Sequence, residues 1–479
     1  MNYKERAVSG ILWSLSQQIS SKVVGFGISI FLARILEPSQ FGLIAMLSIF
    51  IAIGNSLLDS GLTASLIRTP NADHRDFSTV FYFNLAGSTL LYALLFLFAP
   101  LISDFYNQPI LKAVVRVYGL ILIINAFFGV QSTLLIKDMK FKLQTNIQVP
   151  AAIGGGILGI VLAKLGYGVW ALVWMGLCNS FLSTAFHWVY SSWRPGLIFD
   201  KEIFKKHINF GYKMTVSGLI DTIYQNLYLI IIGKYFSAAQ LGFYSRADSI
   251  SQLPISNISA AINKVTYPMF AEIAHDPVQL KNVYKKLMQQ VIFWNAPALT
   301  FLCVIAQPLF HILLTDKWLP AVPYFQILCI CGIMYPLHSY NLNILKVMGK
   351  ASLFLKLEVI KKAISVIGIL IFIPFGIYGL LYFQLFFNFV AYYINSMYSG
   401  RLISYPVKEQ IEDIFPILAI SSTIGVSCYL LNILLINLYI PAFMQIGIIS
   451  IFYFGVYYGA GLLVKLSAIK DFNQLILKK

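Results

Sequence analysis

Long apolar stretches follow one another along the whole chain, and short polar connections separate them. A helix needs roughly 20 apolar residues to cross the ~30 Å hydrocarbon core of a bilayer. The stretches reach that length, and they are too long and too evenly apolar for the strands of a membrane barrel. The pattern predicts an all-α polytopic membrane protein with about 14 transmembrane helices, near residues 8–35, 41–67, 77–102, 113–136, 143–164, 169–192, 208–233, 241–270, 286–314, 320–347, 353–374, 377–400, 411–435 and 441–465.

Composition agrees with a membrane protein. The chain is 58% hydrophobic and 11% charged, whereas soluble domains are about 25% charged. No polar stretch is long enough to form a separate soluble domain. The first apolar run, residues 8–36, is too long for the core of a signal peptide, so we expect no cleavable one. All five cysteines fall inside apolar runs, and we interpret them as small apolar packing residues rather than disulfide or metal sites.

The net charge of +16 is distributed unevenly between the two ends of the predicted helices. If the N-terminus is cytoplasmic, 23 of the 35 lysines and arginines lie at cytoplasmic ends, five lie at the opposite ends and seven lie within spans or at their edges. Cytoplasmic loops of membrane proteins carry such an excess of basic residues. The bias therefore predicts a multi-pass protein with both termini cytoplasmic, contacts with membrane lipids, and no nucleic-acid partner.

Two sequence matches suggest that the chain contains an internal repeat. Residues 33–42 (ARILEPSQFG) match residues 233–242 (GKYFSAAQLG), and residues 168–173 (GVWALV) match residues 376–381 (GIYGLL). The offsets, 200 and 208, are nearly equal. Six-helix halves of this kind are typical of transporters with a substrate site between the halves.

The repeat gives the expected domain organisation. Residues 1–192 form an N-terminal six-helix lobe, residues 193–207 a cytoplasmic amphipathic linker, and residues 208–400 a second six-helix lobe; residues 401–479 add two helices and a cytoplasmic tail. In the linker, Phe199, Ile203 and Phe204 are expected to lie against the membrane while the lysines face the headgroups.

Polar residues recur on one face of the predicted spans 8–35, 41–67, 208–233 and 241–270. In the repeat, the first two of these spans are equivalent to the last two. Charges at membrane depth usually face a cavity or a partner. Together they predict a wet, basic central cavity; the alternative is that they only join helices to one another or snorkel. The expected substrate-binding residues are Gln18, Lys22, Lys213, Gln225, Arg246, Gln252 and Asn263. Three carboxylates are expected to form ion pairs in the cavity or to bind a coupling ion, H⁺ or Na⁺: Asp59, Asp221 and Asp248.

No catalytic residue set is expected. The chain lacks the Gly-x-x-x-x-Gly-Lys-Ser/Thr loop that binds nucleotide phosphates, which argues against direct use of ATP. The histidines are scattered, and His338, deep in a predicted span, is interpreted as a packing residue. We therefore expect no enzyme and no cofactor other than a coupling ion.

Several segments resemble the Wzx-type polysaccharide exporters of the multidrug/oligosaccharidyl-lipid/polysaccharide (MOP) flippase superfamily, with the colanic-acid-exporter-like branch most similar. The segments are residues 6–13 (RAVSGILW), 32–42 (LARILEPSQFG), 59–68 (DSGLTASLIR), 81–84 (FYFN), 166–173 (GYGVWALV) and 241–247 (LGFYSRA). The resemblance implies two six-helix lobes that form a V around a central cavity. It also implies alternating access and export of undecaprenyl-diphosphate-linked oligosaccharide across the bacterial cytoplasmic membrane for surface polysaccharide biosynthesis.

Two other functions compete with this one. A MOP-type exporter of drugs or small molecules is the first, but a basic cavity does not suit cationic drugs. A membrane polysaccharide polymerase or glycosyltransferase is the second, but such enzymes usually carry a long outer loop, and every predicted outer loop here is short. Polymerase machinery is a further expected partner of a flippase.

Overall fold

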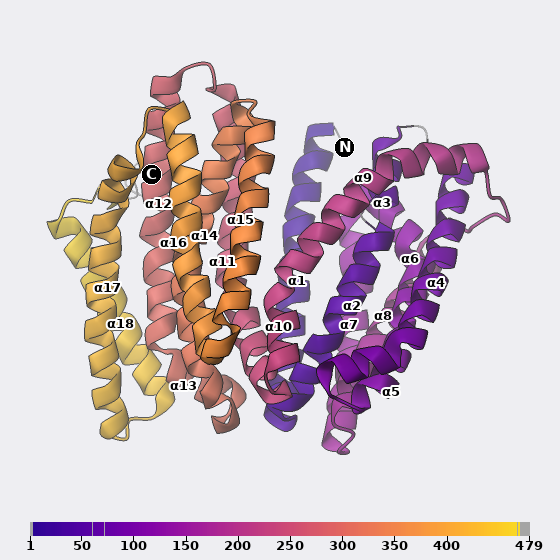
Figure 1. Cartoon of the computed structure of the whole chain (residues 1–479), viewed down its shortest axis with the longest axis horizontal. Coiled ribbons are helices and arrows are strands. Elements are labelled where there is room, and N and C mark those ends of the chain that lie inside the picture. Colours follow the sequence, from indigo (N-terminus) through magenta and orange to yellow (C-terminus); the bar gives the residue numbers. More distant parts are fainter. Residues whose placement is uncertain (1–2, 60, 71, 467, 470–479) are drawn as a thin grey trace. The chain divides into compact units, whose positions relative to one another are not determined.

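The computed structural model describes residues 3–59, 61–70, 72–466 and 468–469. The described residues form helices and connections and contain no strand, so the all-α prediction is confirmed for them. Every predicted span coincides with one helix or with two consecutive helices. The helices form two compact units, residues 1–242 and residues 243–479 (Figure 1).

The described helices are built for a lipid environment. Ten of them are long and apolar enough to cross a membrane, or up to 11 if a bent pair counts as one span. Three of these ten stretches contain two successive α-helices each: Pro38–Arg68, Ile110–Lys137 and Ala351–Leu402. In the stretch His74–Tyr106 only 17% of the most apolar window is buried, which suits a helix whose apolar side chains face lipid. The chain is a multi-pass membrane protein, although the count of 14 spans is not confirmed.

The described residues of the first unit form ten helices and the start of an eleventh. They are α1 (Tyr3–Ile35), α2 (Pro38–Asp59), α3 (Leu62–Arg68), α4 (His74–Tyr106), α5 (Ile110–Tyr118), α6 (Leu120–Lys137), α7 (Phe141–Lys164), α8 (Val169–Tyr190), α9 (Lys201–Gln225), α10 (Leu227–Tyr235) and the first residues of α11 (Ala238–Glu272). Helix α7 packs between α1 and α8, and α9 packs on α2, α3 and α4. The connection 191–200 joins α8 to α9, and we call the end of the unit that carries it the linker end (Figure 1).

The glutamines of the first repeat match occupy equivalent places in the structure. Gln40 and Gln240 are each the third residue of their helix, and each side chain accepts a hydrogen bond from the backbone N–H of the residue before that helix, Glu37 at 3.2 Å and Ser237 at 3.1 Å. This is half of a capping box, which satisfies a backbone donor at a helix start. The glycines of the second match, Gly168 and Gly376, both have a positive φ, a conformation that glycine adopts at little cost.

In the second unit, the part of the chain that the structure describes contains the rest of α11 and seven further α-helices. These are α12 (Pro277–Val304), α13 (Ala306–Leu314), α14 (Val322–Val347), α15 (Ala351–Phe372), α16 (Gly376–Leu402), α17 (Val407–Asn437) and α18 (Ala442–Leu463), with short 3₁₀ turns η1 (Asp316–Ala321) and η2 (Ile373–Phe375). Its core is rich in buried aromatic and aliphatic side chains of α12, α14, α16, α17 and α18.

The two C-terminal helices belong to this second core rather than standing apart. Helix α17 packs along α12, and α18 packs on α17 and α13. At one end of α12, Lys281 pairs with Glu409 at 2.7 Å and Lys285 pairs with Asp413 at 2.8 Å. Tyr405 adds a hydrogen bond to Asp413 at 2.5 Å. These contacts fix the start of α17 to α12.

The compact units divide the chain at a different place from the repeat. Because α9 and α10 pack on α2 and α4, residues 193–242 belong to the first unit. The repeat predicts a second lobe that begins at residue 208. That boundary describes which segments are equivalent in sequence, and it stays a prediction.

Candidate functional site

The predicted site residues fall on four helices, α1, α2, α9 and α11. The side chains of Gln18, Asp59, Lys213 and Asn263 lie outside the part of the chain that the structure describes. The other predicted residues are described, and each helix is considered within its own unit.

On α1, the polar residues serve two different purposes. Gln17 donates a hydrogen bond to Gln148 of α7 at 2.9 Å, so it joins two helices in the way that polar residues do in membrane bundles. Lys22 is exposed, five residues further along the same helix. The predicted polar face of α1 is therefore partly helix contact and partly open.

On α9, the predicted polar face is exposed. Ser217, Asp221 and Gln225 follow one another at intervals of four residues, and all three are exposed. Directly after Gln225 the chain bends: the segment Met214–Gln225 meets α10 at 46°. The bend residue, Asn226, donates through its side-chain amide to the carbonyl of Thr222 at 2.8 Å. Helices broken in this way are common at the binding sites of transporters.

On α11, the structure brings two of the predicted residues together. The side-chain amide of Gln252 lies 3.4 Å from Asp248 Oδ1, one turn away. The guanidinium of Arg246 lies 5.8 Å from the ring centre of Trp318, a cation–π geometry. Phe243 packs edge-on against the same indole at 6.0 Å. Arg246 is therefore held by an aromatic side chain, which fixes where its charge lies.

A buried hydrogen-bonded chain in the first unit was not anticipated. His207, fully buried near the start of α9, lies 2.7 Å from Ser65 Oγ through Nδ1 and 2.9 Å from Asp76 Oδ1 through Nε2. The three residue types also occur in hydrolases, but Ser65 is 6% exposed and lies within α3. A nucleophile needs access to substrate. We interpret these hydrogen bonds between Ser65, His207 and Asp76 as the link that holds the start of α9 to α3 and α4.

The same end of α4 also holds the connection 191–200. Ser78 accepts a hydrogen bond from the backbone of Gly196 at 3.0 Å, and Thr79 accepts one from Asp200 at 3.1 Å. His74 binds the carbonyl of Arg194 at 2.9 Å. These contacts give the connection a fixed path. The only sequence signal for this arrangement was the position of Asp76 and His207 at the ends of predicted spans.

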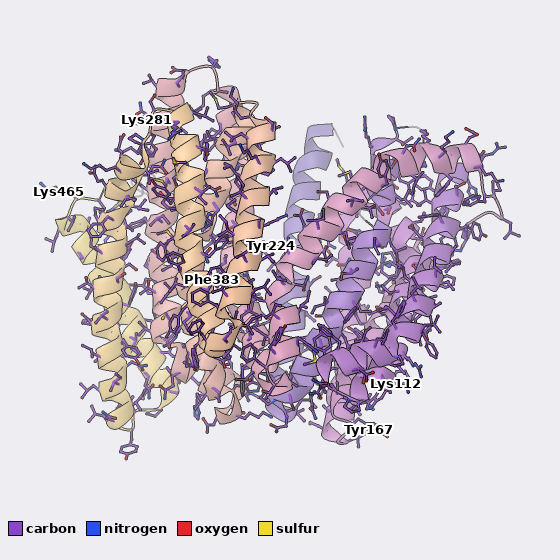
Figure 2. All side chains as sticks on the ribbon, viewed as in Figure 1. Lys112, Tyr167, Tyr224, Lys281, Phe383 and Lys465 are labelled. Carbon is purple, nitrogen blue, oxygen red and sulfur yellow. The ribbon has the colours of Figure 1, made fainter. Side chains whose placement is uncertain are left out.

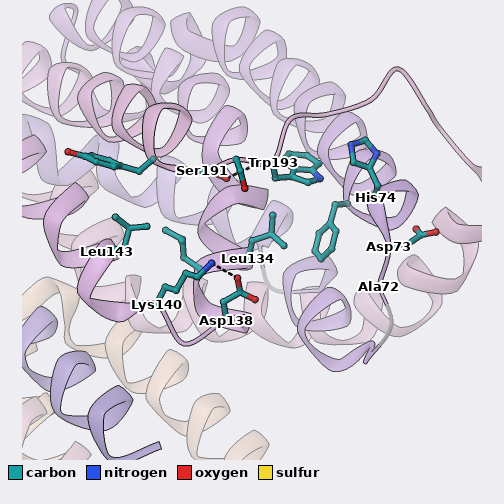
Figure 3. A pocket seen from close by; sticks show the side chains of 13 residues that line it. Ala72, Asp73, His74, Leu134, Asp138, Lys140, Leu143, Ser191 and Trp193 are labelled. Carbon is teal, nitrogen blue, oxygen red and sulfur yellow. Dashed lines mark hydrogen bonds and ion pairs between the residues drawn. The ribbon is translucent and has the colours of Figure 1, made fainter. Parts of the chain in front are cut away.

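A cavity of about 270 Å³ lies at the linker end of the first unit (Figure 3). We call it the linker-end pocket. None of the predicted site residues lines it. Three connections form its rim, and the lining residues are Ala72, Asp73, His74, Phe77, Leu134, Leu135, Asp138, Lys140, Leu143, Tyr190, Ser191, Ser192 and Trp193.

The described residues contain no group of three or more histidine, cysteine, aspartate or glutamate side chains that would hold a metal ion. The five cysteines are free. Among them, Cys329, Cys331 and Cys428 are buried, as expected for packing residues.

Comparison with known proteins gives a consistent set of relatives. The sequence profile of the family described as "Polysaccharide biosynthesis protein" matches residues 31–323. The lipopolysaccharide biosynthesis protein WzxC of Escherichia coli is 25% identical over 375 residues, 78% of this chain and 76% of that protein. The teichuronic acid biosynthesis protein TuaB of Bacillus subtilis is 25% identical over 71% of this chain and 73% of its own.

A third relative, the succinoglycan biosynthesis transport protein ExoT of Rhizobium meliloti, is 23% identical over 68% of this chain and 67% of its own. Among solved structures, the lipid II flippase MurJ in an inward closed conformation superimposes with a TM-score of 0.72 over 93% of this chain and 99% of that one, at 12% identity. An inward-facing multidrug resistance transporter of the MATE family and MOP superfamily superimposes with a TM-score of 0.59. The match covers 82% of this chain and 98% of that one, at 16% identity. These likenesses in structure establish a shared fold.

Proposed function

Since the chain belongs to the polysaccharide biosynthesis protein family, whose profile covers more than half of its length, we propose that it is a flippase for undecaprenyl-diphosphate-linked oligosaccharide. It moves the repeat unit from the inner to the outer leaflet of the cytoplasmic membrane by alternating access. The resemblance to Wzx-type exporters noted in the sequence is confirmed by the family match and the WzxC relative. Like the ExoT relative, the chain is a transport protein and not an enzyme.

One coincidence carries the proposal. A chain with the sequence of a polysaccharide biosynthesis protein has the fold of a protein named as a flippase of lipid II over 93% of its length. Lipid-linked glycans share one transport problem, because a large polar head must cross a layer in which unpaired polar groups cost several kcal/mol. A fold that solves this problem for one such lipid suits another.

The basic residues of the helices support a diphosphate-bearing substrate. Lys22 on α1 is exposed, and Arg246 on α11 is held against Trp318. Ammonium and guanidinium groups bind phosphate oxygens through short charge-assisted hydrogen bonds. We assign Lys22, Arg246 and Lys213 to the diphosphate, and Gln18, Gln225, Gln252 and Asn263 to polar parts of the substrate.

The direction of transport rests on the charge bias. Basic residues at helix ends or in connections at the linker end of the first unit are Arg68, Arg75, Lys137, Lys140, Lys142, Arg194, Lys201, Lys205 and Lys206. Those at the opposite end are fewer, namely Arg34, Lys112, Lys164 and Lys234, of which Lys112 is labelled in Figure 2. We propose that the linker end faces the cytoplasm, where lipid-linked repeat units are assembled. Polysaccharide polymerase machinery is a proposed partner on the other side.

A MOP-type drug exporter is the second candidate, and the similarity to the MATE fold favours it. The two candidates differ in what accumulates when the protein is removed. If the chain is a flippase, lipid-linked repeat units accumulate in the inner leaflet of cells that lack it. Leaflet-resolved labelling measures this accumulation. Unchanged glycolipid distribution together with increased drug sensitivity would favour the exporter.

A further inference from the structure

The linker-end pocket is a built cavity rather than a gap between helix ends. It lies where residues 72–73 before α4, the turn 138–140 between α6 and α7, and residues 190–193 at the end of α8 and after it converge. Asp73 caps α4 by accepting hydrogen bonds from the backbone of Arg75 and Asp76, and Asp76 returns a capping bond to Asp73. This capping box fixes one wall of the pocket.

The aromatic wall of the pocket is rigid as well. The Trp193 ring packs against Phe77 at 6.3 Å, Phe81 at 6.0 Å and His74 at 6.0 Å between ring centres. His74 is also tied by its ring nitrogen to the backbone of Arg194. Figure 3 shows Trp193 and His74 together on one side of the cavity, with Lys140, Asp138 and Leu143 on the other. A ring fixed in this way offers an apolar face without loss of side-chain entropy on binding.

The charges of the pocket do not suit an anion. Asp138 and Lys140 form an ion pair at 2.9 Å, and both side chains are about half exposed, at 49% and 57%. Hydrogen bonds from Asp76 hold the pKa of the Asp73 carboxyl below its ordinary value, so this group is charged at neutral pH. Two carboxylates against one ammonium repel a phosphate. Carboxylate oxygens accept hydrogen bonds, and they therefore suit a ligand with several hydroxyl groups.

The size of the pocket limits the ligand to one small ring. Its volume of about 270 Å³ falls just below the range of roughly 300–1,000 Å³ that is typical of sites for drug-sized ligands. The pocket combines a flat aromatic wall, hydroxyl-binding carboxylates, one ammonium and the hydroxyls of Ser191 and Ser192. A neutral sugar ring has the matching groups, because its hydroxyls lie at the edge and its C–H groups form apolar faces.

We propose that the linker-end pocket binds one neutral sugar residue of the glycan, separately from the basic residues assigned to the diphosphate. The proposal rests on the proposed function, which brings a glycan head to the cytoplasmic side of the protein. The pocket then selects the glycan before transport: Asp73 and Asp138 accept hydroxyl hydrogen bonds, Lys140 donates to a ring or hydroxyl oxygen, and Trp193 contacts the apolar face.

Saturation-transfer NMR with the purified full-length protein in nanodiscs tests this pocket directly. The probes are free glucose, galactose and N-acetylglucosamine, with glucuronate and phosphoethanolamine as charged comparisons. We expect saturation transfer to at least one neutral sugar and little to glucuronate. Asp138→Asn weakens that binding about tenfold, because a hydrogen bond to a charged group contributes about 1.5 kcal/mol. Ser192→Trp, which fills the pocket, abolishes it.

The matched control is Asp104→Asn, the same change at the other end of α4, which leaves sugar binding unchanged. Equal saturation transfer in wild type, Asp138→Asn and Ser192→Trp would overturn the proposal, as would absence of transfer to every neutral sugar. A stronger response to phosphoethanolamine than to any sugar would make this a lipid-headgroup site instead. Glycolipid flipping by the same preparation is measured in parallel, so that wild-type flipping without sugar binding rejects the pocket alone.

Discussion

Gly42 and Gly242, 200 residues apart in the chain, lie against each other through their backbones. A Cβ atom on Gly42 would lie 1.8 Å from the carbonyl oxygen of Ala238, and one on Gly242 would lie 1.9 Å from that of Pro38. Each glycine therefore contacts the first residue of the other's helix, and the four residues form two pairs at the repeat offset. A reciprocal contact of this kind is expected where equivalent helices of the two repeats, here α2 and α11, cross at equivalent residues.

Replacing either glycine at this crossing is expected to destabilise the protein severely. Gly42→Ala places a methyl group against a backbone carbonyl, which cannot move aside as a flexible side chain could. Overpacking of this kind lowers the free energy of unfolding by at least about 1–3 kcal/mol. The melting temperature in detergent, followed by size-exclusion chromatography, measures the effect. Gly129→Ala is the control, because no atom lies within 4 Å of the position of its Cβ. Equal melting temperatures for the two variants would contradict the close approach.

The link between α9 and α4 is expected to be a second point of stability. His207→Ala leaves Asp76 and Ser65 without their buried partner, and an unpaired buried polar group costs about 1–3 kcal/mol. We predict a lower melting temperature and faster proteolysis in the 191–200 connection. His275→Ala, which removes an exposed histidine, serves as the control. A variant as stable as wild type would show that the hydrogen-bonded chain does not hold α9.

The proposed topology predicts opposite labelling at the two ends of the first unit. In a version without the five native cysteines, Ser192→Cys is expected to react with a membrane-impermeant maleimide only after the cells are opened. Tyr167→Cys, at the opposite end and 55% exposed, is expected to react in intact cells. Labelling of Ser192→Cys from outside would reverse the orientation and with it the direction of transport.

Ion coupling is expected to depend on a carboxylate, with Asp221 as the first candidate. It lies one turn from Ser217 and one turn from Gln225, before the bend of α9. A charge at membrane depth is costly unless it is paired or ion-bound. We predict that Asp221→Asn removes the response of flipping to an imposed pH or Na⁺ gradient, while the protein still binds lipid-linked glycan.

The alternative role of Asp221 is a structural partner of Lys213 or Lys22. In that case Asp221→Asn lowers stability and leaves the gradient response of the remaining folded protein intact. Asp59→Asn and Asp248→Asn, measured in the same vesicles, show whether another of the predicted carboxylates carries the ion. If wild-type flipping ignores both gradients, the coupling prediction is wrong.

The sequence predicted the helices and the repeat well because both leave a local or periodic pattern. Apolar runs of spanning length predicted where helical segments lie, although not the breaks that divide some of them into two helices. The matching Gln40 and Gln240 make the same capping bond. Asp221 and Gln225 lie on one side of α9 for the same reason, since four-residue spacing places side chains on one side of a helix.

Contacts between distant segments were not predictable in this way. His207 binds partners 142 and 131 residues away, and no spacing rule connects such positions. The linker-end pocket is built from three connections whose residues are ordinary at turns. Gln17, the neighbour of the expected site residue Gln18 on α1, bonds to Gln148 of another helix. Polarity alone does not distinguish a helix contact from a ligand contact.

The central claim is tested most directly by flipping in reconstituted vesicles with fluorescent undecaprenyl-diphosphate-linked oligosaccharide and a leaflet-specific quencher. We predict that wild-type protein moves the probe between leaflets much faster than protein-free vesicles do. Lys22→Gln with Arg246→Gln slows this at least tenfold, since each charge-assisted hydrogen bond to phosphate contributes about 1.5–3 kcal/mol. Lys164→Gln, an exposed lysine at the end of α7, leaves the rate unchanged. Wild-type protein that moves the probe no faster than empty vesicles would contradict the account.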